Sequence, residues 1–130
     1  MGVLAHITES RQKLFLLITS CLAFISMGVS QAMYGPFYPV FRQTFDLGAA
    51  AVAVVTTMHF GGATAAIAAS GFISRKLGAI PVAVGSAALL CVGYATIALS
   101  ATWPVVVGGA LVLGVGFGGL VSLNFLIARV

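Results

Sequence analysis

The chain has 130 residues, of which 61% are hydrophobic and only 6% are charged, and its formal net charge is +4. A water-soluble domain usually carries about 25% charged residues, so this composition excludes an ordinary soluble domain and indicates that lipid solvates most of the surface. The basic residues are scattered along the chain and form no basic stripe, so the net charge does not indicate nucleic-acid binding.

Four apolar segments are long enough to cross a membrane, because a hydrocarbon core about 30 Å thick needs roughly 20 apolar residues in a helix. These segments lie at about 14–36, 47–74, 78–99 and 101–128. We therefore predict an all-α polytopic membrane protein with four transmembrane helices, surrounded by the lipid bilayer. Residues 1–13 would form a cytoplasmic N-terminal segment, and residues 14–130 would form the four-helix transmembrane region.

The first segment also resembles a secretory signal peptide, because basic residues and an apolar run precede the small-x-small sequence Ser30-Gln31-Ala32. The apolar run is longer than the hydrophobic region of most signal peptides, and hydrophobicity continues towards Phe41. We therefore predict that this segment remains in the protein as a membrane span.

Basic residues lie mainly on one side of the four predicted spans. That side carries Arg11, Lys13, Arg75, Lys76 and Arg129. The opposite side receives only Arg42. Because Lys and Arg are enriched in cytoplasmic loops, we expect both termini in the cytoplasm and the chain in a cell membrane, either plasma or inner.

A few polar side chains interrupt the apolar spans, where lipid cannot satisfy their hydrogen bonds. Gln31, Tyr34 and Tyr38 share one face of the first predicted helix, His59 lies in the second and Asn124 in the fourth. If they converge inward, these groups line a wet cavity that can hydrogen-bond a small solute. The alternative is that each bonds to a neighbouring helix and binds no ligand.

Small residues recur at four-residue spacing in two of the spans. The second span carries Gly62, Ala66 and Ser70, and the fourth carries Gly114 and Gly118 with Gly116 between them. Small residues one turn apart let helix backbones approach closely, so we expect these positions at helix crossings.

No catalytic or metal-binding pattern is visible. The only acids are Glu9 and Asp46, both outside the spans, and Cys21 and Cys91 form no CxxC pair. We therefore predict that the protein is not an enzyme and binds neither a metal nor a cofactor.

The segment from Gly71 to Gly78 resembles the loop between helices two and three of the major facilitator superfamily. Its two glycines and Lys76 match the pattern Gly-x-x-x-Asp-Arg/Lys-x-Gly-Arg/Lys-Arg/Lys. Arg75 stands where that family has an acid, and Ala79 and Ile80 replace the final basic pair. The series Gly114-Val-Gly116-Phe-Gly118 is similar to the glycine motif in the fourth helix of that family.

This resemblance implies the first four of twelve helices in an alternating-access transporter for a small solute. It further implies a cytoplasmic loop at Gly71, Arg75, Lys76 and Gly78, and a partner in the form of missing C-terminal helices or another membrane subunit. Two alternatives remain, namely a small four-helix dimeric multidrug exporter and a four-span membrane scaffold or assembly subunit that transports nothing.

Overall fold

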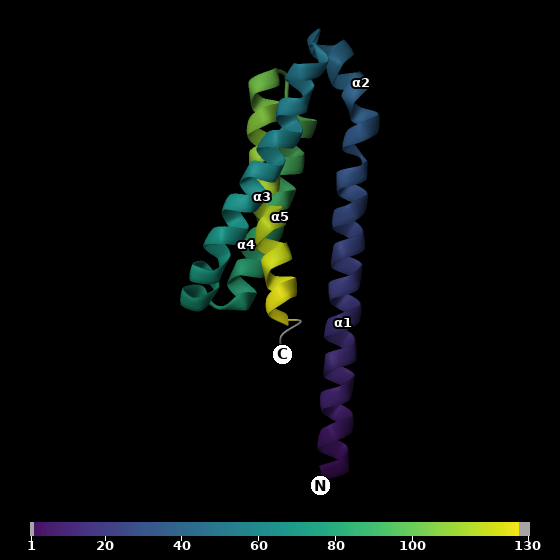
Figure 1. Cartoon of the computed structure of the whole chain (residues 1–130), viewed down its shortest axis with the longest axis vertical. Coiled ribbons are helices and arrows are strands. Elements are labelled where there is room, and N and C mark those ends of the chain that lie inside the picture. Colours follow the sequence, from purple (N-terminus) through teal and green to yellow (C-terminus); the bar gives the residue numbers. More distant parts are fainter. Residues whose placement is uncertain (1, 128–130) are drawn as a thin grey trace.

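The computed structural model of the protein describes residues 2–127, which contain helices and no strand (Figure 1). The helices are α1 (Gly2–Ala32), α2 (Tyr34–Phe45), α3 (Ala49–Leu77), α4 (Ala79–Ala98) and α5 (Trp103–Ile127). The predicted all-α fold is confirmed for this part of the chain. Arg129, which contributed to the predicted orientation, and the predicted end of the last span at residue 128 lie outside the described residues.

Four helical segments are long and apolar enough to cross a membrane. They are Glu9–Phe45, Ala49–Leu77, Ala79–Ala98 and Trp103–Asn124. The number of spans predicted from apolar length therefore agrees with the structure over residues 2–127. Four such helices and so few charged residues are the helix lengths and the composition of an integral membrane protein.

The first span differs from its predicted bounds of 14–36, because it begins earlier and ends later. Helix α1 starts at Gly2, and only Met33 separates it from α2, which continues to Phe45. The backbone hydrogen bonds from Met33 to Val29 and from Phe37 to Met33 carry the helical path across this junction. Pro36 does not end the helix because it falls in the first turn of α2, where a missing N–H group costs little.

Helix α2 ends instead at Asp46, whose φ of 50° places it in the left-handed region. The backbone N–H groups of Asp46 and Leu47 both donate to the Arg42 carbonyl oxygen, which satisfies the end of the helix. Aspartate tolerates this conformation better than most residues.

The connection between α3 and α4 is shorter than predicted. Helix α3 continues to Leu77, so Gly71, Arg75 and Lys76 are helical and only Gly78 lies between the two helices. Gly78 has a φ of 86°, a conformation that L side chains rarely adopt, and its N–H group donates to the Ser74 carbonyl oxygen. The Lys76 ammonium lies 4.6 Å from the centre of the Phe72 ring.

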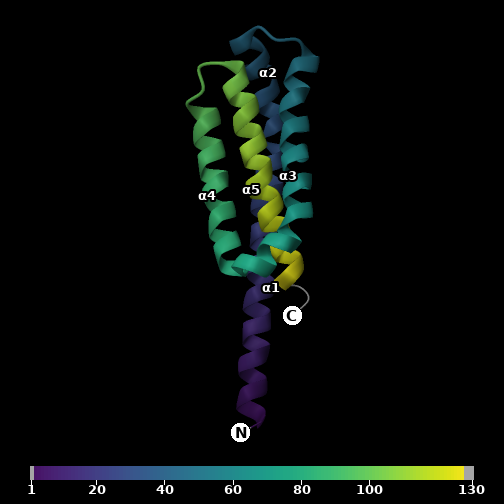
Figure 2. The same cartoon turned by 90° about the vertical axis from the view of Figure 1, so that its left-hand side faces the viewer.

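The helices form a tight part and a loose part. Helix α5 packs along both α3 and α4, while α1 and α2 touch this three-helix group at few positions. Figure 1 shows α1 and α2 as one long arm beside the group, and Figure 2 shows α5 between α3 and α4. The group places α5 at its centre, with Val106, Ala110 and Leu113 fully or almost fully buried.

Glycines bring the backbones of this group together. A Cβ atom added at Gly62 would lie 2.6 Å from the Leu111 carbonyl oxygen, and one added at Gly116 would lie 2.7 Å from the Ser86 carbonyl oxygen. At Gly114 an added Cβ would collide with the His59 backbone.

Gly118 and Ser70, two further small residues singled out in the sequence, are both buried. A Cβ atom added at Gly118 would collide with the Ala63 backbone and would lie 2.9 Å from the Ala66 side chain. Ser70 is buried and donates its hydroxyl hydrogen bond to the Ile67 carbonyl oxygen of its own helix.

Candidate functional site

Two polar side chains, from α1 and α2, meet the His59 side chain of α3. The Gln31 amide nitrogen of α1 lies 2.7 Å from His59 Nε2, and the Tyr34 hydroxyl of α2 lies 3.2 Å from His59 Nδ1. His59, on α3, is only 4% exposed. With the amide nitrogen of Gln31 facing the ring, Nε2 accepts a hydrogen bond and the Nδ1–H group donates to the Tyr34 oxygen. Both ring nitrogens are therefore satisfied without a charge.

Aromatic rings surround the imidazole. The Tyr34 ring meets it edge-on with ring centres 5.5 Å apart, and the rings of Phe60 and Phe117 lie at 5.6 and 5.4 Å. A polar group in such apolar surroundings costs free energy unless its hydrogen bonds are made. The bonds to Gln31 and Tyr34 therefore fix the position of the ring and hold α1 and α2 against α3.

A cavity of about 140 Å³ adjoins this cluster. Gln31, Tyr34 and His59 contribute polar groups to its wall, and Tyr94 of α4 adds another aromatic ring with a hydroxyl. Met27 of α1 and Phe117 and Leu120 of α5 supply apolar surface. The cavity thus lies between α1 and the three-helix group, with neutral hydrogen-bonding groups on one wall.

The structure separates the five side chains that the sequence proposed as cavity contacts. Gln31, Tyr34 and His59 come together at the cavity, whereas Tyr38 and Asn124 are not part of its lining. The Tyr38 hydroxyl instead bonds to the Thr56 hydroxyl of α3. Asn124 is 8% exposed and lies one turn beyond Leu120 on α5. A shared helix face therefore did not guarantee a shared cavity.

Tyr94 is a site residue that sequence reasoning did not single out. It lies in α4, beside Gly93, whose missing side chain lets Leu113 of α5 approach. The available signal was the single tyrosine in α4, which lines the cavity because of where α4 lies relative to α1.

The site offers neutral hydrogen bonds and aromatic surface. Within the described residues no group of three His, Cys, Asp or Glu side chains is close enough to hold a metal ion. The ion pair between Glu9 and Lys13, at 2.8 Å, is exposed and lies near the start of α1. What this arrangement can do is hold a small uncharged molecule by hydrogen bonds and ring contacts.

Comparisons with protein-family models, with curated proteins and with solved structures found no match to this chain.

Proposed function

We propose that these four spans belong to an alternating-access secondary transporter that moves a small solute across a cell membrane. The observation that carries the proposal is the Gln31–His59–Tyr34 cluster beside a cavity of about 140 Å³. Polar groups are costly inside a membrane span and commonly mark the path of a solute. The order of sequence motifs that resembles the major facilitator superfamily supports the same function.

The division into a tight group and a loosely attached arm also supports transport. Alternating access requires one rigid part to move against another around a central site. The cluster lies where the arm of α1 and α2 meets the group of α3, α4 and α5. Much of the apolar surface of the arm is exposed, as at Phe15, Leu22 and Ile25, so further membrane helices of a complete carrier would find surface to cover.

A second function, a membrane scaffold or assembly subunit that moves no solute, is favoured by one observation. Among the described residues, every buried side-chain nitrogen or oxygen atom has a hydrogen-bond partner. A scaffold would use Gln31, Tyr34 and His59 only to join its helices, and would leave the cavity empty.

Uptake of labelled small neutral solutes, both sugars and phenols, tests the proposed transport. Cells that express the protein from its own gene are compared with cells that lack the gene and with cells that carry Gln31→Ala. We expect uptake to fall at least severalfold in the cells without the gene and in those with Gln31→Ala. Uptake should be unchanged with Thr57→Ala, because the Thr57 side chain is exposed and its hydroxyl bonds only to its own helix. Equal uptake in all four strains across the panel of sugars and phenols would favour the scaffold.

The membrane orientation is tested separately. The excess of basic residues before α1 and at the end of α3 predicts both termini in the cytoplasm. A small tag at either terminus should react with an impermeant reagent only after the cells are opened. A tag that reacts in intact cells would reverse the orientation and place the α3–α4 connection outside.

A further inference from the structure

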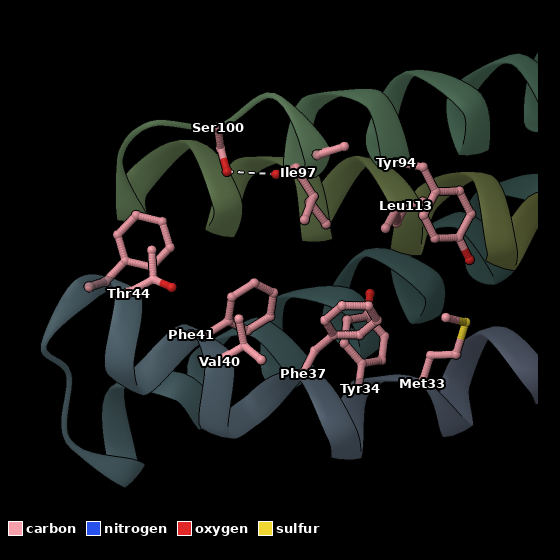
Figure 3. Close-up of a pocket in the computed structure, with 12 residues that line it drawn as sticks. Met33, Tyr34, Phe37, Val40, Phe41, Thr44, Tyr94, Ile97, Ser100 and Leu113 are labelled. Atoms are coloured by element: carbon pink, nitrogen blue, oxygen red, sulfur yellow. Dashed lines mark hydrogen bonds between the residues drawn. The ribbon is translucent and has the colours of Figure 1, made fainter.

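A second and larger cavity, with a volume of about 510 Å³, lies between α2 and the C-terminal part of α4, and Leu113 of α5 completes its wall. In Figure 3 the rings of Phe37 and Phe41 point from α2 into this space, and Ile97 and Tyr94 face them from α4. We call it the outer cavity and the 140 Å³ space beside His59 the inner cavity. None of the residues that line the outer cavity carries a charge.

The two cavities are stacked along the helices and share a wall. Tyr34 and Tyr94 line both of them. On α5 the outer cavity touches Leu113, and the inner cavity touches Phe117 one turn further on. On α4 the inner cavity reaches Leu90, one turn before Tyr94. The two tyrosines therefore mark the boundary between an apolar chamber and a polar one.

We propose that the outer cavity, together with its boundary to the inner cavity, is a binding site for a small uncharged amphiphile, such as a phenol or a short-chain alcohol. Its apolar body occupies the outer cavity, and its single hydrogen-bonding end lies at the boundary, between the hydroxyl groups of Tyr34 and Tyr94. This names the substrate class of the proposed transporter and therefore rests on the proposed function, although binding is measured without transport.

The chemistry of the walls selects this class. A charged ligand would lose its hydration without meeting an opposite charge, because the lining of both cavities contains only neutral groups and the imidazole already bonded to Gln31 and Tyr34. A purely apolar ligand would leave the hydroxyl groups at the boundary without a new partner. Among the residues whose side chains the structure describes, no hydrogen bond is made by the Tyr94 hydroxyl, which is thus available to a ligand.

The protein contains a natural reporter for this site. Trp103 is the only tryptophan in the chain. Its ring centre lies 6.0 Å from that of Phe41 and 5.7 Å from that of Phe45, and both phenylalanines line the outer cavity. A brominated molecule in the outer cavity should therefore quench the fluorescence of Trp103.

The test titrates the full chain, in phosphatidylcholine nanodiscs, with three probes of similar size. We expect saturable quenching by 4-bromophenol, at concentrations about five-fold lower than for bromobenzene, because one hydrogen bond typically contributes about that factor. No saturable quenching is expected for 4-bromobenzoate, which carries a charge.

Three variants locate the effect. Ala98→Phe, in the wall of the outer cavity, should abolish saturable quenching, whereas Ala88→Phe makes the same change at an exposed position of α4 outside both linings and should preserve it. The double variant Tyr34→Phe with Tyr94→Phe should keep the cavity and remove the preference for 4-bromophenol over bromobenzene. Helix content by circular dichroism checks that each variant folds.

Several outcomes would overturn the site. Linear quenching that is equal for the neutral probes and unchanged by Ala98→Phe would mean that the probes only partition into lipid. Phosphatidylcholine with brominated acyl chains tests for lipid in the cavity. If it quenches Trp103 and unlabelled phenol does not relieve the quenching, the outer cavity holds a lipid chain. A third outcome separates the two proposals. If 4-bromophenol binds saturably but cells without the gene take up phenols and sugars as before, the binding site is supported and the transport function is rejected.

Discussion

The three-helix group of α3, α4 and α5 and the arm of α1 and α2 are held by different interactions. In the group, glycines at Gly62, Gly114 and Gly116 bring backbone against backbone. The arm instead reaches the group through side chains, namely the hydrogen bonds of Gln31 and Tyr34 to His59. The rings of Phe41 and Phe45 add contacts with Trp103 at the outer end.

The comparison shows what can hold helices together where lipid replaces water. Lipid tails are as apolar as leucine, so helix association depends on close van der Waals packing and on hydrogen bonds between helices. The group uses close packing over long lengths of helix and therefore forms a fixed frame. The arm depends on a few polar bonds, and for this reason we expect it to be the part that moves.

The largest effect is expected at the helix crossing between α3 and α5. Gly114→Ala places a methyl group against the His59 backbone, which cannot move aside as a flexible side chain can, and should destabilise the protein by about 3 kcal/mol. Gly108→Ala is the matched control on the same helix, since nothing lies within 4 Å of a Cβ atom there. Unfolding in mixed detergent–SDS micelles measures both. Equal stabilities would show that backbone contact does not hold the group together.

A smaller effect is expected when the arm loses its hydrogen bonds to His59. His59→Leu removes the partner of both Gln31 and Tyr34 and should weaken docking of the arm by about 1–2 kcal/mol. Cys21 on α1 and Cys91 on α4 are both exposed and are the only cysteines, so spin labels on them report the position of the arm in the otherwise native chain.

The distance distribution between these labels should broaden in His59→Leu and stay narrow in Thr57→Leu, a control at an exposed position of the same helix. A narrow distribution in both variants would mean that apolar contacts alone position the arm and that its hydrogen bonds to His59 do not.

The bond between Tyr38 and Thr56 should contribute less than the His59 cluster. Tyr38→Phe removes one hydroxyl and should cost about 0.6 kcal/mol, the average for a hydrogen bond between membrane helices. Combining it with Thr56→Val in a double-mutant cycle isolates the pair, because the second change should add little once the first is made. Fully additive losses in unfolding free energy would show that the two hydroxyl groups are not coupled.

The smallest effect is expected at hydroxyl groups that bond only within their own helix. Thr64 donates to the Phe60 carbonyl oxygen and Thr96 to the Val92 carbonyl oxygen. Thr64→Val and Thr96→Val should each change the unfolding free energy by less than about 0.5 kcal/mol in the same micelle assay. A larger loss at either position would reveal a contact that this comparison omits.

Local sequence chemistry anticipated the spans better than their ends. The apolar lengths gave the correct number of membrane-compatible helices over the described residues. The helical path continues past the predicted end of the first span at residue 36, because a proline in the first turn of a helix removes no hydrogen bond that the helix needs. The left-handed Asp46 ends the helix ten residues after Pro36.

The candidate site could be predicted only in part. Gln31, Tyr34 and His59 were recognisable as polar groups in apolar helices, and the structure brings them within hydrogen-bonding distance. Tyr94 escaped notice, and Asn124 lies outside the cavity lining. The sequence specifies which residues share a face of one helix, but not which neighbouring helix that face meets.

The sequence by itself determined that the chain contains four apolar segments long enough to span a membrane as helices, and that very few polar groups lie within them. That conclusion needs only the thickness of a bilayer and the cost of unsatisfied polar groups in lipid. The tertiary structure alone decided that α5 lies between α3 and α4, that His59 joins the arm to the group, and that two tyrosines divide two cavities. These features depend on how each helix is rotated about its axis, which close packing at the glycines sets and apolar composition leaves free.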